Sequence, residues 1–101
     1  MEIFGKQYEL IKNYNDAFNE EEFMNKVTDY FEGYDYIVGD ISYSKLRLKG
    51  FTKKNNKINN KINDYSNVEK YISENCAYGC KYFILEKKNV WFKHFFVLSC
   101  T

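Results

Sequence analysis

The sequence predicts an α+β domain in which two helices pack on a mostly antiparallel sheet. Several short segments alternate apolar with polar residues, which is typical of half-buried strands. Two other segments carry apolar residues at helical spacing behind good capping residues. With 101 residues the chain has the length of one domain, so we expect residues 1–101 to fold together as β-β-α-β-β-α-β-β.

The first two strands and the first helix are predicted from the N-terminal third of the chain. Strands at 2–4 and 7–14 are joined by a turn at Gly5, because glycine readily adopts a positive φ. Asn19 is a good N-cap with a glutamate three residues later, so a helix should begin there and end at Gly33. The side chains expected to face the core fall at helical spacing: Phe23, Met24, Val27, Tyr30 and Phe31.

A β-hairpin is predicted next, with strands at 34–38 and 45–51. Gly39-Asp40 and the Ser-Tyr-Ser sequence that follows shortly after it supply turn residues between the strands. In the second strand Leu46 and Leu48 point to one face, and the basic residues between and beside them point to the other. The hairpin should therefore present one apolar and one basic face.

The C-terminal half adds a loop, a helix and two strands. Residues 52–64 are rich in Asn and Lys, so we expect a mobile, solvated loop there. Ser66 and Glu69 form a second capping box, and a short helix with the apolar stripe Val68, Tyr71, Ile72 and Cys76 is expected there. A strand at 81–87 has a continuous apolar middle, which indicates burial on both faces, and 90–98 forms an aromatic last strand.

Three segments of the chain carry a recognisable pattern. They are residues 34–51 with their glycines and Leu-Arg-Leu, the Cys76-Ala-Tyr-Gly-Cys80 segment with the apolar strand after it, and Tyr14-Asn-Asp-Ala-Phe18. Together they resemble the YutD-like family of small bacterial proteins over most of residues 1–86. The biochemical role of that family is not established, so the resemblance implies a family and no particular reaction.

Overall charge and cysteine content narrow the class of protein. The net charge is +1, so the whole molecule lacks the strong field that favours nucleic acid or membrane partners. The N-terminus has neither the basic nor the apolar region of a signal peptide, and the apolar C-terminal run is too short to span a bilayer. Three Cys without an export signal indicate reduced thiols, so we expect a cytoplasmic protein that does not contact membranes.

The basic face of the hairpin is the best candidate for a binding surface. Arg47 is the only arginine of the chain, and its planar donors suit RNA, a nucleoprotein assembly or an acidic protein surface. The alternative for Arg47 is an ion pair with Asp35 or Asp40, and the alternative for the lysines is a solvated strand face. The predicted contact residues are Tyr43, Lys45, Arg47, Lys49, Phe51, Lys53, Lys54 and Lys57, with Lys61 just beyond them.

No catalytic motif is present in the sequence, and we therefore expect a binding module without cofactor or enzymatic activity. There is no Gly-rich phosphate loop, nucleophile elbow or metalloprotease motif. One alternative is a thiol or zinc protein centred on Cys76 and Cys80, with His94 and Cys100 as further ligands. Packed thiols are the more common role of such cysteines. Another alternative is a structural homodimer that pairs through the aromatic strand at 90–98.

Overall fold

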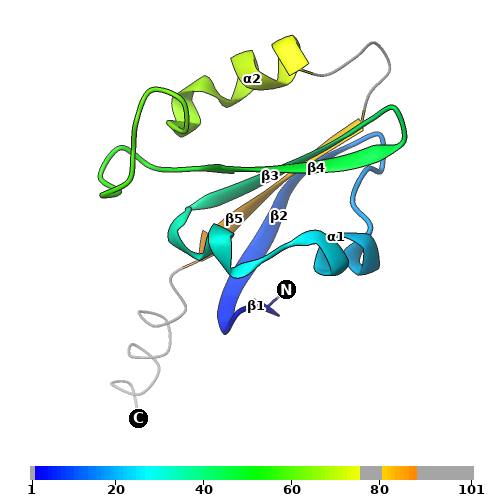
Figure 1. The fold of residues 1–101 in the computed structure, drawn as a ribbon, viewed down its shortest axis with the longest axis horizontal. Coiled ribbons are helices and arrows are strands. Elements are labelled where there is room, and N and C mark those ends of the chain that lie inside the picture. The colour runs from blue at the N-terminus through cyan, green and yellow to red at the C-terminus, as the bar shows by residue number, and fades with distance from the viewer. Residues whose placement is uncertain (1, 76–80, 89–101) are drawn as a thin grey trace.

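The computed structural model describes residues 2–75 and 81–88 and shows a five-stranded antiparallel sheet. The elements are strands β1 (Glu2–Ile3), β2 (Lys6–Tyr14), β3 (Tyr36–Ser42), β4 (Lys45–Phe51) and β5 (Lys81–Lys88), helices α1 (Glu20–Lys26) and α2 (Val68–Asn75), and the short 3-10 helices η1 (Asp29–Gly33) and η2 (Tyr65–Asn67). The strand order β1-β2-β5-β3-β4 puts β5 at the centre and β4 at one edge (Figure 1). Helices α1 and α2 lie on opposite faces of the sheet, so the predicted α+β class is confirmed.

Helix α1 begins where the sequence predicts and ends earlier. Its N-terminus is capped by Asn19, whose side chain accepts a hydrogen bond from the Glu22 N–H at 2.9 Å. The chain leaves the helix at Val27 and Thr28, which adopt extended backbone with ψ of 141° and 170°. Both side chains are β-branched, and such residues favour extended over helical backbone. The predicted single helix is therefore divided into α1 and the 3-10 helix η1.

The early end of α1 changes which side chains reach the core. Phe23 of α1 and Phe31 of η1 are buried, as predicted. The predicted core positions of Met24 and Tyr30 are wrong, since these side chains are 44% and 66% exposed. A continuous helix would have kept the helical period through Tyr30, whereas the extended link between α1 and η1 resets it.

The β3–β4 hairpin turns at Tyr43 and Ser44. Both residues have positive φ, 53° and 63°, which is typical of a two-residue turn between antiparallel strands. The predicted turn at Gly39-Asp40 is wrong, because β3 continues through both residues. Glycine is required at position 39 for another reason: a Cβ there would overlap the ring of Phe83 on the neighbouring strand β5.

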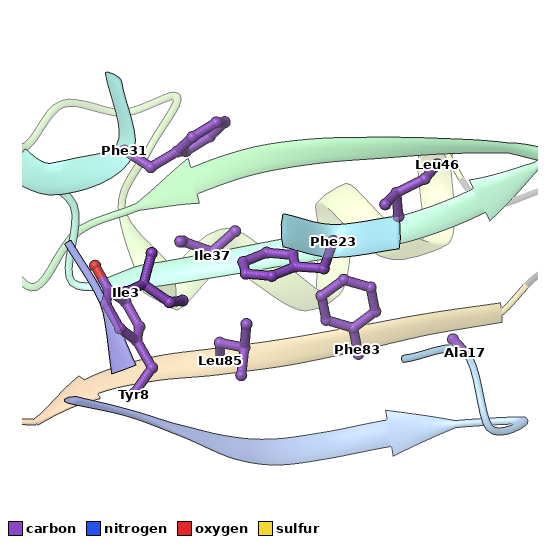
Figure 2. Packing of buried hydrophobic residues seen from close by; sticks show 9 residues of the cluster. All are labelled: Ile3, Tyr8, Ala17, Phe23, Phe31, Ile37, Leu46, Phe83 and Leu85. Carbon is purple, nitrogen blue, oxygen red and sulfur yellow. The ribbon is translucent and has the colours of Figure 1, made fainter. Parts of the chain in front are cut away.

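The larger apolar core lies between the sheet and α1. Phe23 of α1 and Phe83 of β5 pack edge to face with ring centroids 5.9 Å apart, and Figure 2 shows Ile37 of β3 beside them. Burial of several rings removes a large apolar area from water, which is the main force that stabilises a small domain. The buried members of this cluster are Ile3, Tyr8, Ala17, Phe23, Phe31, Ile37, Leu46, Phe83 and Leu85.

A second apolar cluster lies under α2 on the opposite face of the sheet. Tyr71 and Ile72 of α2 pack against it, in agreement with the predicted apolar stripe of that helix. Its buried members are Tyr36, Val38, Phe51, Val68 and Ile84. Since Phe83 and Leu85 face the first cluster and Ile84 faces the second, strand β5 is buried on both faces, as its continuous apolar sequence indicates.

The start of α2 differs from the prediction. The capping box of Ser66 and Glu69 is not formed, because α2 continues directly from η2. The cap is Asp64, whose carboxylate accepts hydrogen bonds from the N–H and hydroxyl of Ser66 at 2.9 and 2.8 Å. These hydrogen bonds lower the pKa of Asp64. The predicted strand at 90–98 lies outside the described residues.

Candidate binding surface along strand β4

An ion pair between adjacent strands lies at the centre of the predicted surface. Arg47 of β4 is directly opposite Asp40 of β3, and its Nε and Nη2 both donate to Asp40 Oδ2, at 3.1 and 2.6 Å. The Asp40 side chain is 3% exposed, whereas that of Arg47 is 47% exposed. A carboxylate so deeply buried requires a charged partner, so Arg47 has a structural role beside any role in binding. Of the two ion-pair partners considered for Arg47, the structure shows Asp40.

The basic face of the hairpin is partly covered by α2. The ammonium of Lys49 lies over the rings of Phe51 and Tyr71, 5.4 and 5.6 Å from their centroids. Phe51 is fully buried and packs edge to face against Tyr71. The predicted contact of Phe51 with a partner is therefore wrong, because its ring points into the cluster under α2. The even spacing that places Phe51 on the face of Lys49 also places it beneath the helix.

Tyr43 and Lys45 form the exposed tip of the hairpin. The Tyr43 side chain is 91% exposed, because its positive φ at the turn directs it away from both apolar clusters. Lys45 follows at the first position of β4 and is also exposed. These two predicted contact residues are open to a partner. They lie at the end of β4 opposite to the lysines of the 52–64 loop, and β4 spans roughly 20 Å.

The 52–64 loop is anchored by a buried polar pair. Thr52 and Asn63 are buried, and the Thr52 hydroxyl donates to Asn63 Oδ1 at 2.9 Å. The Thr52 N–H donates to the Asn63 carbonyl at 2.7 Å, and the Tyr65 N–H donates to the Thr52 carbonyl at 2.9 Å. A parallel bridge thus joins Thr52 to Asp64 at the end of β4. The loop is therefore not solvated throughout, since Thr52 and Asn63 are buried, and its predicted mobility stays a prediction.

Asp35 organises the start of this loop. Its Oδ2 accepts hydrogen bonds from the Lys53 N–H at 2.7 Å and from Asn56 Nδ2 at 3.1 Å. Asp35 is therefore a structural residue, and it is not the partner of Arg47. The Lys53 ammonium lies 3.9 Å from Glu86 and is half exposed. The other loop lysines extend into solvent and are exposed: Lys54, Lys57 and Lys61.

A groove of about 530 Å³ follows the outer edge of β4. Arg47, Lys49 and Tyr71 line it on the side of α2. Tyr30 and Tyr34 line it on the side of η1, with their hydroxyls 3.0 Å apart. Phe31 of η1 and residues of β4 and the loop complete the lining: Leu48, Gly50, Asn60, Ile62 and Asn63. The groove combines cations, tyrosine hydroxyls and apolar side chains, which suits a peptide-like ligand better than a reaction centre.

Sequence reasoning missed the tyrosines and Ile62 of this groove. Tyr30 was expected to face the core and is exposed beside the groove, whereas Tyr71 packs against the cluster under α2 as predicted and also lines the groove. Gly50 is required beside the groove, because a Cβ at this position would overlap the ring of Tyr34, a contact that only the structure reveals. Ile62 is an apolar residue within a polar loop, which the sequence does show, and the structure leaves its side chain 74% exposed.

Alkaline pH should destabilise the sheet next to this surface. The Tyr36 hydroxyl donates to Glu86 Oε2 at 3.1 Å, and burial together with the Glu86 charge raises the pKa of Tyr36 from 10.0 to about 12. Because the folded-state pKa is raised, this stabilisation is complete below pH 10 and is lost as pH rises towards 12. The free energy of unfolding should fall over that range. The free energy of unfolding of the Tyr36→Phe variant, measured by urea denaturation, should fall less over the same pH range. An equal fall in both proteins would show that Tyr36 is not the group responsible.

The zinc and homodimer alternatives fall on residues that the structure does not describe. Cys76, Cys80, His94 and Cys100 lie outside the described residues, as does the aromatic segment 90–98. Within residues 2–75 and 81–88, no group of three His, Cys, Asp or Glu side chains is placed to hold a metal ion. In that same part of the chain, no helix has the length and apolar character needed to cross a membrane.

Comparison with known proteins identifies the family. Residues 2–86 match the model of the family described as "Putative antitoxin YutD-like". The chain is 43% identical over 85 residues to "Putative antitoxin YutD" of Bacillus subtilis (strain 168), an alignment that covers 84% of this chain and 93% of the relative. The solution NMR structure of protein yutD from B. subtilis matches with a TM-score of 0.73 and 40% identity, over 88% of this chain and 81% of that chain. The resemblance seen in the sequence is therefore confirmed, and this chain belongs to the YutD-like family.

Proposed function

We propose that this protein is a small non-catalytic binding module that contacts an acidic protein surface in the cytoplasm through β4 and the 52–64 loop. The observation that carries the proposal is the row of basic residues beside the groove. Arg47 and Lys49 line the groove, while Lys54 and Lys57 lie on the loop that closes its end. A row of cations beside apolar and tyrosine side chains complements an acidic protein surface.

The name of the relative supports a binding role. The B. subtilis relative is described as a putative antitoxin, a description that is compatible with binding to another macromolecule. A binding role of this kind requires a surface that complements the target. We propose the same type of action for this chain, with the groove-lining basic surface as the contact.

A protein partner fits the geometry better than a nucleic acid. Arg47 is paired with Asp40 and Lys49 lies over two rings, so the surface offers a few fixed cations that suit individual carboxylates of a protein better than the continuous charge of a phosphate backbone. The net charge of +1 also provides no long-range attraction for a polyanion. RNA remains the second candidate because Tyr43 is 91% exposed next to Lys45, an arrangement on which a base can stack.

A charge-reversal experiment tests the proposed function. The full chain and the Lys54→Glu, Lys57→Glu double variant are used to capture partners from the native cytoplasm, with and without nuclease. These lysines are preferable to Lys53, whose ammonium lies 3.9 Å from Glu86. We expect a nuclease-resistant partner that the double variant retains about tenfold less well, equivalent to about 1.4 kcal/mol. The melting temperature should not change, because both side chains are exposed.

The matched control carries the same change of charge elsewhere. Lys6 and Lys26 lie on β2 and α1, away from the edge formed by β4, and both are exposed. The Lys6→Glu, Lys26→Glu variant should bind the partner as the wild type does. Loss of the partner after nuclease treatment would replace the protein proposal with the RNA one. Equal capture by all three proteins would contradict both versions.

A further inference from the structure

The outer edge of β4 carries backbone groups that do not pair with β3. In an antiparallel pair, successive residues alternately direct their N–H and C=O towards the partner strand and away from it. The two-residue turn makes Ser42 and Lys45 a hydrogen-bonded pair, so the odd-numbered residues of β4 face β3. Leu46, Leu48 and Gly50 therefore direct their N–H and C=O groups outward. In the described part of the chain, no strand lies along this stretch of the edge.

The chain itself already extends this edge at one end. Thr52 continues the even-numbered series just beyond β4, and it bonds outward: its N–H donates to the Asn63 carbonyl, and its carbonyl accepts the Tyr65 N–H. This contact supports the assignment of the outward-facing residues. It also shows that the edge accepts an extended backbone, and the groove begins where that contact ends.

We propose that the edge from Leu46 to Gly50 docks an extended segment of the partner protein, which adds a further strand to the sheet. This inference rests on the proposed function, since it specifies how the partner is held. Side chains of an added strand alternate between the two walls of the groove. On the α2 side they would meet Arg47 and Lys49, and on the η1 side they would meet Tyr34. The segment should therefore alternate acidic with apolar or aromatic residues.

A second copy of the chain does not suit this edge. Antiparallel pairing of β4 with itself, centred on Leu48, would place Arg47 of each copy opposite Lys49 of the other on the same face. Like charges directly opposite each other destabilise a strand pair. Lysine on an edge strand commonly prevents such self-pairing. The same charges that exclude a second copy favour an acidic strand.

Amide exchange and a peptide titration test the docking edge in the full chain. In the free protein the amides of Leu46 and Leu48 should exchange quickly, while those of Arg47 and Lys49 should be protected by their bonds to β3. The probe is a short acetylated peptide in which Glu alternates with Val and Tyr. We expect it to shift and protect the Leu46 and Leu48 amides at sub-millimolar concentration. A peptide of the same sequence with an N-methylated backbone should not bind, because it lacks the backbone N–H groups that pair with a neighbouring strand. Its side-chain charges are the same, so charge alone would not explain the difference.

Charge specificity is tested at Lys49. The Lys49→Glu variant should bind the Glu peptide about tenfold more weakly and should bind the matching Lys peptide more tightly than the wild type does. The control Lys6→Glu should leave both affinities unchanged. Circular dichroism and the dispersion of the NMR spectrum show whether Lys49→Glu is folded. If it is not, the Lys45→Glu variant, altered at the exposed start of β4, takes its place.

The outcomes separate this inference from the proposed function. Protection of the Leu46 and Leu48 amides in the free protein would overturn the inference, since the chain or a second copy would then cover the edge. Equal binding of the N-methylated peptide, or no binding of either peptide, would overturn it as well. In either case, continued loss of the captured partner in the Lys54→Glu, Lys57→Glu variant would leave the proposed function in place. Both the inference and the proposed function would be rejected if the peptide tests failed and the double variant also captured the partner as well as the wild type does.

Discussion

Gly39→Ala should lower the free energy of unfolding by about 3 kcal/mol, near the upper end of overpacking effects. The added Cβ would overlap the Phe83 ring. That ring is 1% exposed and packs against Phe18 and Phe23, with centroids 5.0 and 5.9 Å away, so it has no free space into which to move. Urea denaturation measures the loss. Because small domains are stable by roughly 5–15 kcal/mol, this single methyl group should remove a large share of the total.

Two further variants show whether overlap with the Phe83 ring causes the loss of stability in Gly39→Ala. Phe83→Leu in the Gly39→Ala background should recover part of the lost stability, because the shorter side chain leaves room for the Cβ. Gly5→Ala is the control, since a Cβ at Gly5 would have no neighbour within 4 Å. It should cost only about 1 kcal/mol for the positive φ of 76°. A Gly39→Ala protein as stable as Gly5→Ala would contradict the packing explanation.

Arg47→Met should lower the free energy of unfolding by about 2–3 kcal/mol, because it leaves the buried carboxylate of Asp40 without its cation. The value is below the full cost of breaking a buried pair, since Arg47 is half exposed and solvent already screens its charge. Asp40→Asn should cost less, about 1 kcal/mol, because it removes the buried charge and leaves the cation in solvent. Urea denaturation of the two variants and the wild type measures these losses in the free energy of unfolding.

The double variant and a conservative change make this comparison specific. Arg47→Met combined with Asp40→Asn should be more stable than Arg47→Met alone, because no buried charge is left unpaired. Arg47→Lys should lie between the wild type and Arg47→Met, since an ammonium cannot reproduce the two donors of the guanidinium. If Asp40→Asn were the more damaging single change, this account of the ion pair would be wrong.

The sequence predicted those features that depend on local chemistry. Asn19 caps α1 because an amide oxygen satisfies the free N–H groups of a first turn wherever it occurs. The continuous apolar middle of β5 similarly indicated a central strand. The ion pair of Arg47 with Asp40 was one of two pairings that the sequence suggested, and the register of the hairpin determines which of them forms.

The features that the sequence did not reveal depend on contacts between distant segments. Gly39 looked like a turn residue, but the ring that requires it belongs to β5, far along the chain. The sequence position of Phe51 suggested part of a basic surface, but α2 covers this residue and Tyr71 packs against its ring. Tyr30 followed a helical period that predicted burial, and Tyr71 packs against the cluster under α2 as that period predicted, but only the position of the β4 edge shows that both line a groove.

Lysine-directed cross-linking of the captured partner tests the central claim, that this chain binds through the surface along β4. Lysines are distributed over every part of the molecule, so each surface can report a contact. We expect the cross-links between the full chain and its partner to concentrate at Lys45, Lys49, Lys54 and Lys57, and those at Lys45 and Lys49 to become weaker in the Lys54→Glu, Lys57→Glu variant. Cross-links that concentrate at Lys6, Lys12 and Lys26 would place the partner elsewhere and contradict the claim.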